Sequence, residues 1–522
     1  MPVRPFNGAV KSAAAMSGVL AAASAISVGQ LVAAIVAPAA SPLLAVGSAF
    51  IDLTPEWLKS FAIRTFGQND KVVLLGGIVG VLAVAAIGIG LLAARRPQLA
   101  LAAVGGIGGI GAIAALLRPG ASLISVVPAL AGAVMGIAVL MLLSRQLSGQ
   151  ADRTAAEAEA ANDTKRDVSR RRFVVASAAV GVLIASSGGL GAFIAGRRSS
   201  GAVDAVNPMI PSPLDPAGGI PAGADLGIDG VSSFITPNDQ FYRVDTALQV
   251  PIIAADEWRL RIHGLVDREV TLTLADLLEY PTIERDITLT CVSNQVGGEY
   301  AGNARWIGVR LAELLDEAGV QAGADQIVSR SIDGMTIGTP TAVALDGRDA
   351  MLAVAMNGEP LPAAHGYPVR MIVPGLYGYV SATKWLVELE LATFDAYDPY
   401  WVERGWAKEG PIKTMARIDA PKPLARLPAG KVAIAGVAWA QRRGIERVEV
   451  RIDRGVWTEA RLAEVDTIDT WRQWVYEWDA TSGNHALEVR ATDASGEVQP
   501  EARSEPFPSG ATGWHSVVVT VT

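Results

Sequence analysis

The sequence predicts a multi-domain chain in which an α-helical transmembrane bundle is followed by a mixed α+β domain and then by a β-sandwich. Residues 1–200 consist mainly of Ala, Gly, Val, Leu and Ile, whereas residues 236–522 have the charge content of an ordinary globular protein. The mean hydropathy of +0.32 is unusual for a fully soluble chain. The 522 residues allow about three or four folding units. A net charge of −8 without a basic tract argues against a nucleic-acid partner.

Five apolar runs form the predicted bundle, which we assign to residues 1–196. A helix needs about 20 apolar residues to cross a membrane, and the runs lie at about 12–36, 72–94, 99–117, 121–143 and 173–195. None of them contains an ionisable side chain, which favours an anchor over a transporter or a proton relay. All four histidines lie beyond residue 260, so the spans cannot bind a haem through paired histidines. If the protein moves electrons, they must come from or go to another molecule.

The charges between the apolar runs predict an orientation. Basic residues on the side of the N-terminus are Arg4, Lys11, Arg95, Arg96, Arg145, Arg153, Lys165, Arg166, Arg170, Arg171 and Arg172. Those on the opposite side are Lys59, Arg64, Lys71, Arg118, Arg197 and Arg198. The positive-inside bias predicts a multi-pass protein of the cytoplasmic membrane whose globular part is extracytoplasmic. The stretch Ser169–Phe173 (SRRRF) resembles a twin-arginine export signal, or else its arginines hold the inner end of the last span.

Residues 197–235 are predicted to be a linker because Pro and Gly alternate through them. This composition cannot form a core and favours an extended or irregular chain. From residue 236 to 400 the pattern is mixed. It predicts strands at Trp258–Ile262, Ile287–Leu289 and Pro368–Pro374 and a helix at Leu311–Ala318.

Cys291 is the only cysteine in the chain, and it follows the short strand that ends at Leu289. A single sulfur excludes an intramolecular disulfide, a zinc ribbon and a cysteine-bound iron–sulfur cluster. Cys291 begins a Gly/Asn-rich loop, which suits a reactive thiol or a soft metal ligand. The alternative is an inert buried side chain. A cysteine protease would need His263 or His365 as its base, and no such signature surrounds Cys291.

Seven separated blocks carry a family resemblance. They are Thr236-Pro237-Asn238-Asp-Gln-Phe241-Tyr242, Trp258-Arg-Leu-Arg-Ile-His-Gly264, Thr290-Cys291-Val-Ser-Asn294, Trp306-Ile-Gly308-Val-Arg-Leu311, Met356-Asn357-Gly358-Glu-Pro360-Leu-Pro362, His365-Gly366-Tyr-Pro368-Val-Arg370 and Lys384-Trp385. With these blocks in order, Thr236–Leu391 resembles the molybdopterin-binding domain of the sulfite oxidase family, which also includes sulfoxide reductases of the bacterial envelope.

The resemblance implies a cofactor and roles for particular residues. Cys291 would be a ligand of molybdenum, which one molybdopterin otherwise holds. The residues that would contact the pterin and its phosphate are Asn238, Tyr242, His365, Arg370, Ser381 and Lys384. A buried phosphate needs charged donors, which Arg370 and Lys384 can supply. The alternative interpretation gives both residues structural roles only: His365 would cap a turn with its hydrogen bonds satisfied, and Arg370 would form a surface ion pair.

Departures from the family pattern leave the substrate open. Where sulfite oxidases place an arginine shortly after the aromatic pair, this chain has Val244, and Arg243 is the neighbouring cation that could face a substrate. A second arginine is replaced in the Gln295-Val296 region, and the active-site tyrosine is matched by Val354. Oxyanions are normally bound by positive donors, so the loss of these donors weakens the case for sulfite. An uncharged sulfoxide or N-oxide, or another anion bound differently, becomes as suitable.

Residues 401–522 contain short alternating segments at regular spacing. They are Lys431–Val437, Ile445–Asp453, Gln473–Trp478, His485–Thr492 and Ser516–Val521. This pattern predicts a β-sandwich of immunoglobulin type without the cysteine pair, and the resemblance implies a homodimer through it. Trp401, Arg404, Trp406 and Lys408 form an aromatic-basic cluster that is either a packed interdomain seam or a substrate contact.

Together these features predict a membrane-anchored molybdenum–pterin oxidoreductase. It would transfer an oxygen atom to or from a small sulfur oxyanion, sulfoxide or N-oxide. The alternative from another class is a membrane-anchored extracytoplasmic binding or adhesion module without redox activity.

Overall fold

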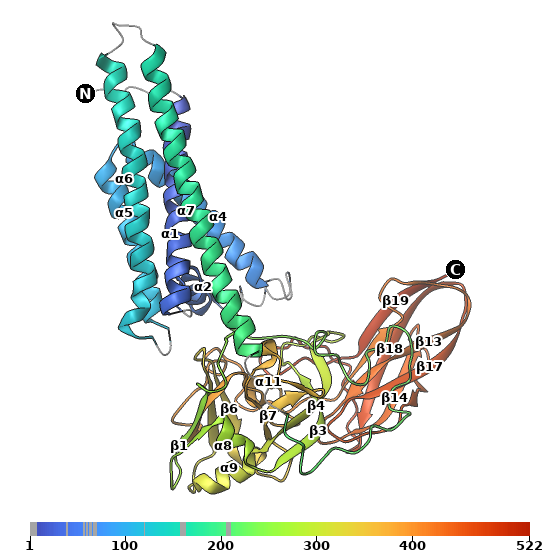
Figure 1. Cartoon of the computed structure of the whole chain (residues 1–522). Coiled ribbons are helices and arrows are strands. Elements are labelled where there is room, and N and C mark those ends of the chain that lie inside the picture. The colour runs from blue at the N-terminus through green and yellow to red at the C-terminus, as the bar shows by residue number, and fades with distance from the viewer. Residues whose placement is uncertain are drawn as a thin grey trace. The chain divides into compact units, whose positions relative to one another are not determined.

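The computed structural model describes residues 8–37, 40–55, 58, 61, 65, 70–118, 121–156, 163–204 and 210–522. The chain divides into two compact units, which are Met1–Gly201 with Ala247–Gln249 and Ala202–Thr246 with Val250–Thr522. The first unit is helical and the second is rich in strands (Figure 1). The basic residues Arg4, Lys59 and Arg64, which the predicted orientation uses, lie outside the described residues.

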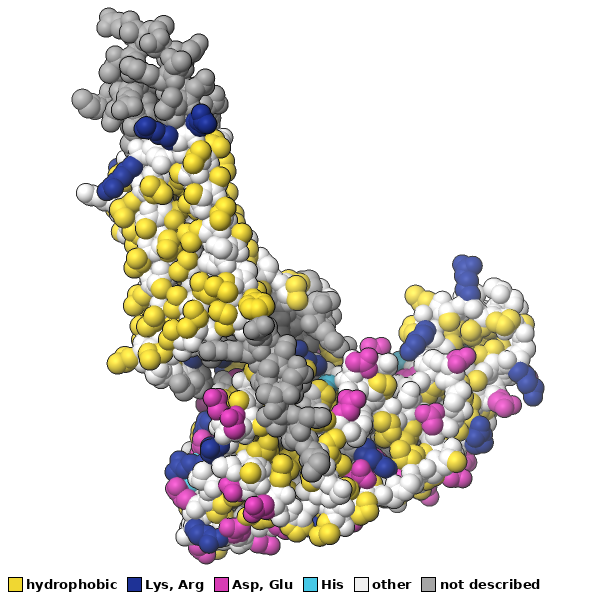
Figure 2. Space-filling view, in the orientation of Figure 1, with side chains coloured by type: hydrophobic (Ala, Val, Ile, Leu, Met, Phe, Trp, Pro, Cys, Tyr) yellow, Lys and Arg dark blue, Asp and Glu magenta, His cyan; other side chains and the backbone are white. Residues whose placement is uncertain are grey.

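The helices of the first unit confirm the five predicted apolar runs. The elements are α1 (Gly8–Val36), α2 (Pro42–Leu53), α4 (Asp70–Ala93), α5 (Pro97–Leu116), η3 (Leu123–Val126), α6 (Val127–Ala156) and α7 (Asp163–Asp204). Within the described residues, five segments are long and apolar enough to cross a membrane: Val10–Val36, Val72–Ala93, Pro97–Leu116, Leu123–Gln146 and Arg171–Ile194. Hydrophobic side chains dominate the visible face of these helices (Figure 2). The short apolar helix α2 was not predicted.

The predicted start of the linker at residue 197 is wrong, because α7 continues to Asp204. Residues 197–204 contain no proline, and the first proline of the Pro/Gly-rich stretch is Pro208. Without proline, nothing in the backbone chemistry stops the helix at residue 197. The Pro-rich stretch described from Ile210 onward is irregular, as expected.

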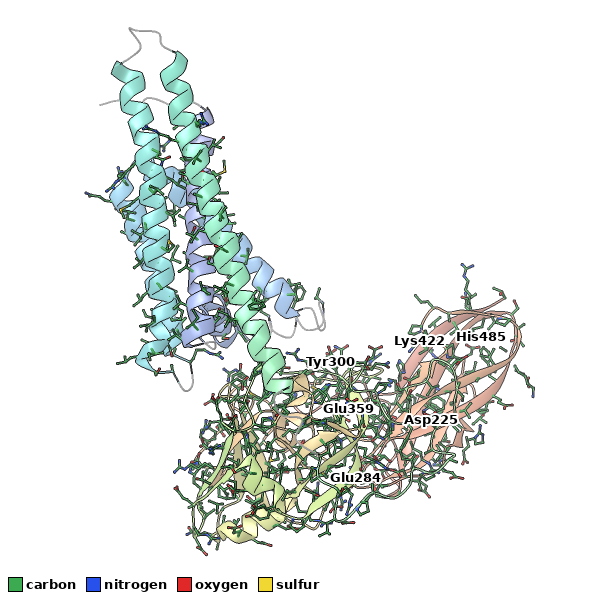
Figure 3. The ribbon with its side chains drawn as sticks, in the orientation of Figure 1. Asp225, Glu284, Tyr300, Glu359, Lys422 and His485 are labelled. Atoms are coloured by element: carbon green, nitrogen blue, oxygen red, sulfur yellow. The ribbon has the colours of Figure 1, made fainter. Side chains whose placement is uncertain are left out.

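This irregular segment packs against the second unit and is not a free spacer. The carbonyl of Phe234 accepts hydrogen bonds from Trp471 Nε1 at 2.9 Å and from Asn303 Nδ2 at 3.0 Å. Phe234 is 3% exposed and Ala224 is fully buried. Asp225, labelled in Figure 3, accepts the amide hydrogen of Phe234. The segment therefore contributes to the core of the second unit.

Glycines let the backbones of α1 and α4 touch. A Cβ atom at Gly18 would lie 2.8 Å from the amide nitrogen of Gly90, and one at Gly90 would lie 2.9 Å from that of Gly18. Small residues at such crossings allow the close approach of helices in membranes, where packing replaces the hydrophobic effect. On the same helix, a Cβ at Gly80 would meet no atom within 4 Å.

We expect Gly90→Leu to separate α1 from α4 and to lower the stability of the helical unit. Forcing a large side chain into a packed site typically costs about 1–3 kcal/mol. The measurement is the thermal unfolding midpoint of the full chain in detergent. Gly80→Leu is the matched control and should unfold close to the wild type. Equal midpoints for the two variants would contradict the helix crossing.

Two sheets build the central part of the second unit. One has the strand order β2-β1-β10-β5-β6, and in the other β3-β4-β7-β8 is extended by β9 on β7. The strands are β1 (Arg259–Gly264), β2 (Val270–Thr273), β3 (Thr282–Thr290), β4 (Ala301–Arg310), β5 (Gln326–Ser331), β6 (Thr336–Pro340), β7 (Met351–Met356), β8 (Glu359–Pro360), β9 (Arg370–Ile372) and β10 (Leu386–Ala392). The helices are α8 (Leu274–Leu278), α9 (Leu311–Ala318), α10 (Thr341–Ala344), η4 (Ala363–His365) and α11 (Gly378–Ser381).

The C-terminal part consists of two facing sheets with a shared apolar core. Their strand orders are β11-β13-β17-β16 and β12-β19-β18-β14-β15. The strands are β11 (Met415–Ala420), β12 (Arg426–Leu427), β13 (Gly430–Trp439), β14 (Ile445–Ile452), β15 (Thr458–Glu459), β16 (Arg461–Leu462), β17 (Arg472–Ala480), β18 (Gly483–Asp493) and β19 (His515–Val521). Trp474, Val448, Leu487 and Val519 are fully buried between the sheets. The region is therefore a β-sandwich.

The aromatic-basic cluster at the junction packs as a seam. The Trp406 ring lies 5.9 Å from Tyr379 of the central part and 5.4 Å from Phe507 of the sandwich, between ring centroids. Lys408 forms an ion pair with Asp398 at 2.9 Å. Arg404 lies over the ring of Tyr400. These contacts match the seam that the sequence left as one of two readings.

An acidic pair joins β3 to the loop before β17. Asp286 is 3% exposed and forms two hydrogen bonds with Arg305, at 2.9 and 2.6 Å. Burial, and then the charge of Asp286, raises the pKa of Asp466 from its ordinary value of 3.8 to about 6. The folded protein therefore binds a proton at Asp466 more tightly than the unfolded chain does.

We expect Asp466→Asn to stabilise the protein above pH 6. Below pH 4 Asp466 is protonated in both the folded and the unfolded wild type. Between pH 4 and 6 the unfolded chain releases this proton and the folded protein keeps it. The free energy of unfolding therefore falls as the pH rises through this window. The advantage of the variant should grow through this window and then level off. Solvent screening at the partly exposed site reduces its size. Unfolding midpoints measured from pH 4 to 8 test this, with Asp479→Asn at an exposed position of β17 as the control. A constant difference across the range would contradict it.

Candidate cofactor site

Cys291 lies directly after β3, at the start of a short loop. Its amide donates to the carbonyl of Tyr300 at 2.9 Å, and its carbonyl accepts from the amide of Asn294 at 3.0 Å. Both bonds fix the backbone on which the sulfur is carried. The sulfur lies 2.9 Å from the hydroxyl of Ser293 and is half-buried. Burial raises the pKa of the thiol, and the Ser293 hydroxyl and the Lys384 charge oppose this rise.

Tyr242 connects Cys291 electrostatically to the cations of the site. Its ring stacks on Phe241 at 5.2 Å between centroids. Burial raises the pKa of the Tyr242 hydroxyl far above its usual range; Cys291 adds to the rise and Arg370 opposes it. On the opposite side, a Cβ added at Gly378 would lie 3.9 Å from the Tyr242 hydroxyl and 3.8 Å from the carbonyl of Thr290. The missing side chain at Gly378 leaves space beside the thiol's strand.

His365 is held as a neutral ring. It is 6% exposed, and its Nε2 lies 2.9 Å from the backbone carbonyl of Asn238. Because a carbonyl only accepts, Nε2 carries the proton and Nδ1 is left as an acceptor. Burial lowers the pKa of His365 to about 4, and the charges of Arg370, Lys384 and Arg243 contribute. A ring with so low a pKa is a weak proton acceptor, which does not suit the base of a cysteine protease.

The side-chain amide of Asn238 is bonded to protein groups at both ends. Its Nδ2 donates to the carbonyl of Met356 at 3.3 Å and to the carboxylate of Glu359 at 3.2 Å, which Figure 3 labels. Its Oδ1 accepts from Asn357 Nδ2 at 2.8 Å. Asn238 thus joins the segment before β1 to the turn between β7 and β8. Its predicted contact with the pterin stays a prediction.

Arg370 is a buried cation without a carboxylate partner among the described residues. It lies on β9 and is 5% exposed. Its Nη1 donates to the carbonyl of His365 at 3.1 Å, and its guanidinium lies 5.1 Å from the ring centroid of Trp306. Its Nε is buried and has no hydrogen-bond acceptor within the described part of the chain. Burial lowers the pKa of Arg370 to about 10, so the group stays charged at neutral pH.

Asp245 links Arg243 to Lys384. One oxygen of its carboxylate lies 2.7 Å from Arg243 Nε and 2.8 Å from Lys384 Nζ. The Lys384 ammonium also lies 4.6 Å from the ring centroid of Trp385. Burial lowers the pKa of Lys384 to about 8, although Asp245 opposes the change. Asp245 was not predicted from the sequence; the only signal is an acid two residues after Arg243.

Ser381 is engaged within the protein. It is fully buried, and its hydroxyl lies 3.0 Å from the carbonyl of Leu376 and 3.1 Å from that of Tyr377. Tyr377 was not predicted. Burial raises its pKa to about 12, and Cys291 adds to the rise, which places Tyr377 in the same electrostatic environment as the thiol. Ser381 therefore supports the turn that carries Tyr377, and its contact with the cofactor stays a prediction.

The assembled residues fit a phosphate-bearing group that carries a soft metal. Three cations, Arg370, Lys384 and Arg243, are compensated by one carboxylate, Asp245. Buried guanidinium and ammonium donors with surplus charge suit a phosphate. Gly366, at φ +116°, allows Arg370 and Lys384 to lie close, because a Cβ there would be 3.1 Å from both side chains. A thiol whose proton is held by burial becomes a thiolate on binding a metal ion.

The central part of this chain is similar to known proteins. Residues 247–401 match the family described as "Oxidoreductase molybdopterin binding domain". Mitochondrial sulfite oxidase of Drosophila melanogaster is 31% identical over 55% of this chain and 59% of its own length. The uncharacterized oxidoreductase YuiH of Bacillus subtilis is 32% identical over 30% of this chain and 74% of its own length. Among solved structures, the sulfane dehydrogenase SoxCD from Paracoccus pantotrophus aligns over 57% of this chain and 88% of that chain, with 24% identity and a TM-score of 0.49.

Fold and relatives together define a protein with an oxidoreductase molybdopterin-binding domain. The chain belongs to the sulfite oxidase family, which confirms the resemblance seen in the sequence. The chain spans about three fifths of the length of the sulfite oxidases from Drosophila melanogaster and Rattus norvegicus. Asn238, Tyr242 and Arg243 precede the first residue of the matched family domain.

Proposed function

We propose that this chain is a membrane-anchored oxidoreductase that carries molybdenum with one molybdopterin and moves an oxygen atom to or from a small molecule. The observation that carries the proposal is Arg370, a buried cation with an Nε that lacks an acceptor among the described residues. A buried donor of this kind costs stability unless a ligand satisfies it. Tyr242 interacts electrostatically with both Arg370 and Cys291, so one cofactor could bring its phosphate to Arg370 and its metal to Cys291.

Six of the predicted residues have a proposed part in binding this group. Cys291 would bind the metal through its sulfur, and Arg370 and Lys384 would bind the phosphate. His365 would orient the pterin through its unprotonated Nδ1, with its other nitrogen fixed by Asn238. Tyr242 would line the pocket with its ring. The bound group would supply two-electron redox chemistry.

The proposed substrates are a small sulfur oxyanion, a sulfoxide or an N-oxide. In the oxidative direction, the product gains its oxygen from water, and two protons and two electrons are released to a separate acceptor. The reductive direction consumes the same two protons and two electrons from a separate donor and releases water. Arg243 remains the proposed substrate-facing cation, but Asp245 already shares its charge. Val244, which is 40% exposed, and Val354, which is buried, both have uncharged side chains. Neither position therefore adds a positive charge to the site. This favours an uncharged substrate.

We further propose that the five apolar helices anchor the protein in the cytoplasmic membrane with the second unit on the extracytoplasmic side. The bias of basic residues supports this orientation. The proposed domains are the helical region that ends at Asp204, the Pro/Gly-rich segment that ends at residue 235, the cofactor domain 236–400 and the sandwich 401–522. The sandwich would be of immunoglobulin type and could form a homodimer.

Metal and pterin analysis of the purified full chain tests the proposal. Protein from a host that makes molybdopterin should contain molybdenum and pterin in equal amounts, and protein from a host that lacks the pathway should contain neither. The loaded protein is then assayed with sulfite, sulfoxides and N-oxides, using artificial one-electron donors and acceptors. Stably folded but metal-free protein from the competent host would reject the enzyme and favour a binding module. Sulfite oxidation at an enzymatic rate would reject only the uncharged substrate.

A further inference from the structure

The loop that follows Cys291 is held by side chains of the C-terminal sandwich. Arg417 Nη1 donates to the carbonyl of Gly298 at 2.8 Å, and Arg503 Nη2 donates to the carbonyl of Val296 at 3.4 Å. The ring of His515 lies against Gly297, because a Cβ at Gly297 would overlap its Nε2. Three residues distant in sequence therefore contact three neighbouring positions of one loop.

Arg417 is itself fixed in place. It lies on β11 and is 5% exposed. Its Nε donates to Asp419 at 2.5 Å and its Nη2 donates to Ser232 Oγ at 2.8 Å. Because the guanidinium is planar and rigid, the bonds at Nε and Nη2 also fix the direction of Nη1, which points at the carbonyl of Gly298. In a buried setting such a charge-assisted bond to a carbonyl is stronger than a neutral one.

The neutral ring of His515 packs against the loop at Gly297. Its Nδ1 accepts the amide hydrogen of Ile418 at 3.0 Å, so its proton is on Nε2. Burial lowers the pKa of His515 to about 4, and the charge of Arg417 contributes. Gly297 has a φ of +81°, a conformation that other residues rarely adopt. Without the ring against it, this glycine would have a wide choice of backbone conformations.

The strand that precedes Cys291 is held from the same side. Gln441 Nε2 donates to the carbonyl of Thr288 at 3.1 Å and lies 3.3 Å from the hydroxyl of Thr290. The amide of Trp471 donates to the hydroxyl of Thr288 at 2.7 Å. The sandwich thus contacts the chain on both sides of the cysteine.

We infer that Arg417 and His515 are positioning residues for Cys291, which fix the loop after the cysteine and thereby the direction of its sulfur. The inference rests on the proposed function for the meaning of that direction, since a metal ligand must be held in place by its supporting groups. In this view the sandwich is a working part of the site as well as a structural domain.

The only thiol of the chain gives a direct test, because any thiol reagent reports on Cys291 alone. The full chain is prepared without cofactor from a host that cannot make molybdopterin, and its labelling rate is measured under native conditions. Arg417→Met should raise the rate about tenfold, which corresponds to the loss of one charge-assisted hydrogen bond. Arg417→Lys, which keeps the charge, should raise it less. His515→Phe keeps an aromatic ring against Gly297 but loses the hydrogen bond from the Ile418 amide. It should raise the labelling rate of Cys291 to an intermediate extent.

Arg451→Lys is the matched control, since Arg451 lies on β14 of the same sandwich and pairs with Glu488 at 2.7 Å. It should leave the labelling rate unchanged. Unfolding midpoints identify a variant that fails to fold, in which case the milder Arg417→Lys and His515→Phe decide. In cofactor-loaded protein, Arg417→Lys should also shift the visible absorption of the sulfur–metal bond. Unchanged labelling and absorption in folded variants would overturn the inference. Faster labelling in a chain that never binds molybdenum would support the inference and reject the proposed function.

Discussion

Cys291→Ser protein from a molybdopterin-competent host is expected to contain less than a tenth of the molybdenum of the wild type and to show no turnover. A serine hydroxyl keeps nearly the same shape but does not ionise near neutral pH, so it cannot replace a thiolate as a soft ligand. The fold should survive, since the change removes no buried apolar group and the backbone bonds of Cys291 to Tyr300 and Asn294 remain. Metal analysis and the unfolding midpoint measure the two effects.

Ser293→Ala is the control for this substitution. It removes the hydroxyl that lies 2.9 Å from the sulfur but leaves the thiol. Because Ser293 opposes the rise in the pKa of Cys291, the thiol of the cofactor-free variant should ionise at higher pH than in the wild type. Molybdenum content should be close to normal. Full retention of molybdenum by Cys291→Ser would mean that the sulfur is not a metal ligand.

Arg370→Met is expected to have opposite effects on cofactor binding and on stability. Without the guanidinium the phosphate loses its buried cation, and pterin content should fall at least tenfold. In the cofactor-free protein the same change should raise the unfolding midpoint. The pKa of Arg370 falls from its ordinary 12.5 to about 10 through burial, which corresponds to roughly 3 kcal/mol of unfavourable interaction at about 1.4 kcal/mol per unit. Methionine fills similar space without a charge.

Arg285→Met provides the contrast, because Arg285 is paired with Asp215 and with Asp349, each at 2.5 Å. Its loss should lower the midpoint and leave the pterin content unchanged. Pterin released by denaturation is measured by fluorescence, and stability is measured with protein from a pterin-deficient host. A lower midpoint for cofactor-free Arg370→Met would show that the guanidinium is satisfied within the protein and is not reserved for a ligand.

The parts of the fold that follow from local pattern could be predicted. Helix α9 begins and ends at the predicted residues, Leu311 and Ala318, because its apolar positions repeat at helical spacing. Strand β11 was missed because its sequence, MARIDA, contains Arg417 and Asp419, which read as exposed charges but form a buried pair. No strand was predicted at residues 302–306, although they lie on β4, which pairs with β3. Gly302 and Asn303 are residue types that are typical of loops, so the pattern did not indicate a strand.

The candidates Cys291, His365, Arg370 and Lys384 came from sequence blocks that carry the family pattern. These side chains interact electrostatically in the fold, and their roles in binding a cofactor stay predictions. What the blocks could not reveal is how the charges are partnered. Asp245 binds Lys384 across 139 positions of sequence, and Arg417 reaches the Cys291 loop across 119. Such partners depend on the tertiary fold and leave no local spacing to recognise.

The contacts of the segment from Ile210 to Phe234 indicate where a shortened chain without the apolar helices should begin. Its carbonyl at Phe234 satisfies the indole of Trp471, and the amide of Leu226 donates to Gln473 at 2.6 Å. Trimming to the first strand of the cofactor domain would remove both groups and leave the Trp471 indole and the Gln473 side chain without these partners. A shortened gene for crystallisation or assay should therefore keep every codon from Ile210 onward, even though that stretch has no helix or strand to mark it as worth keeping.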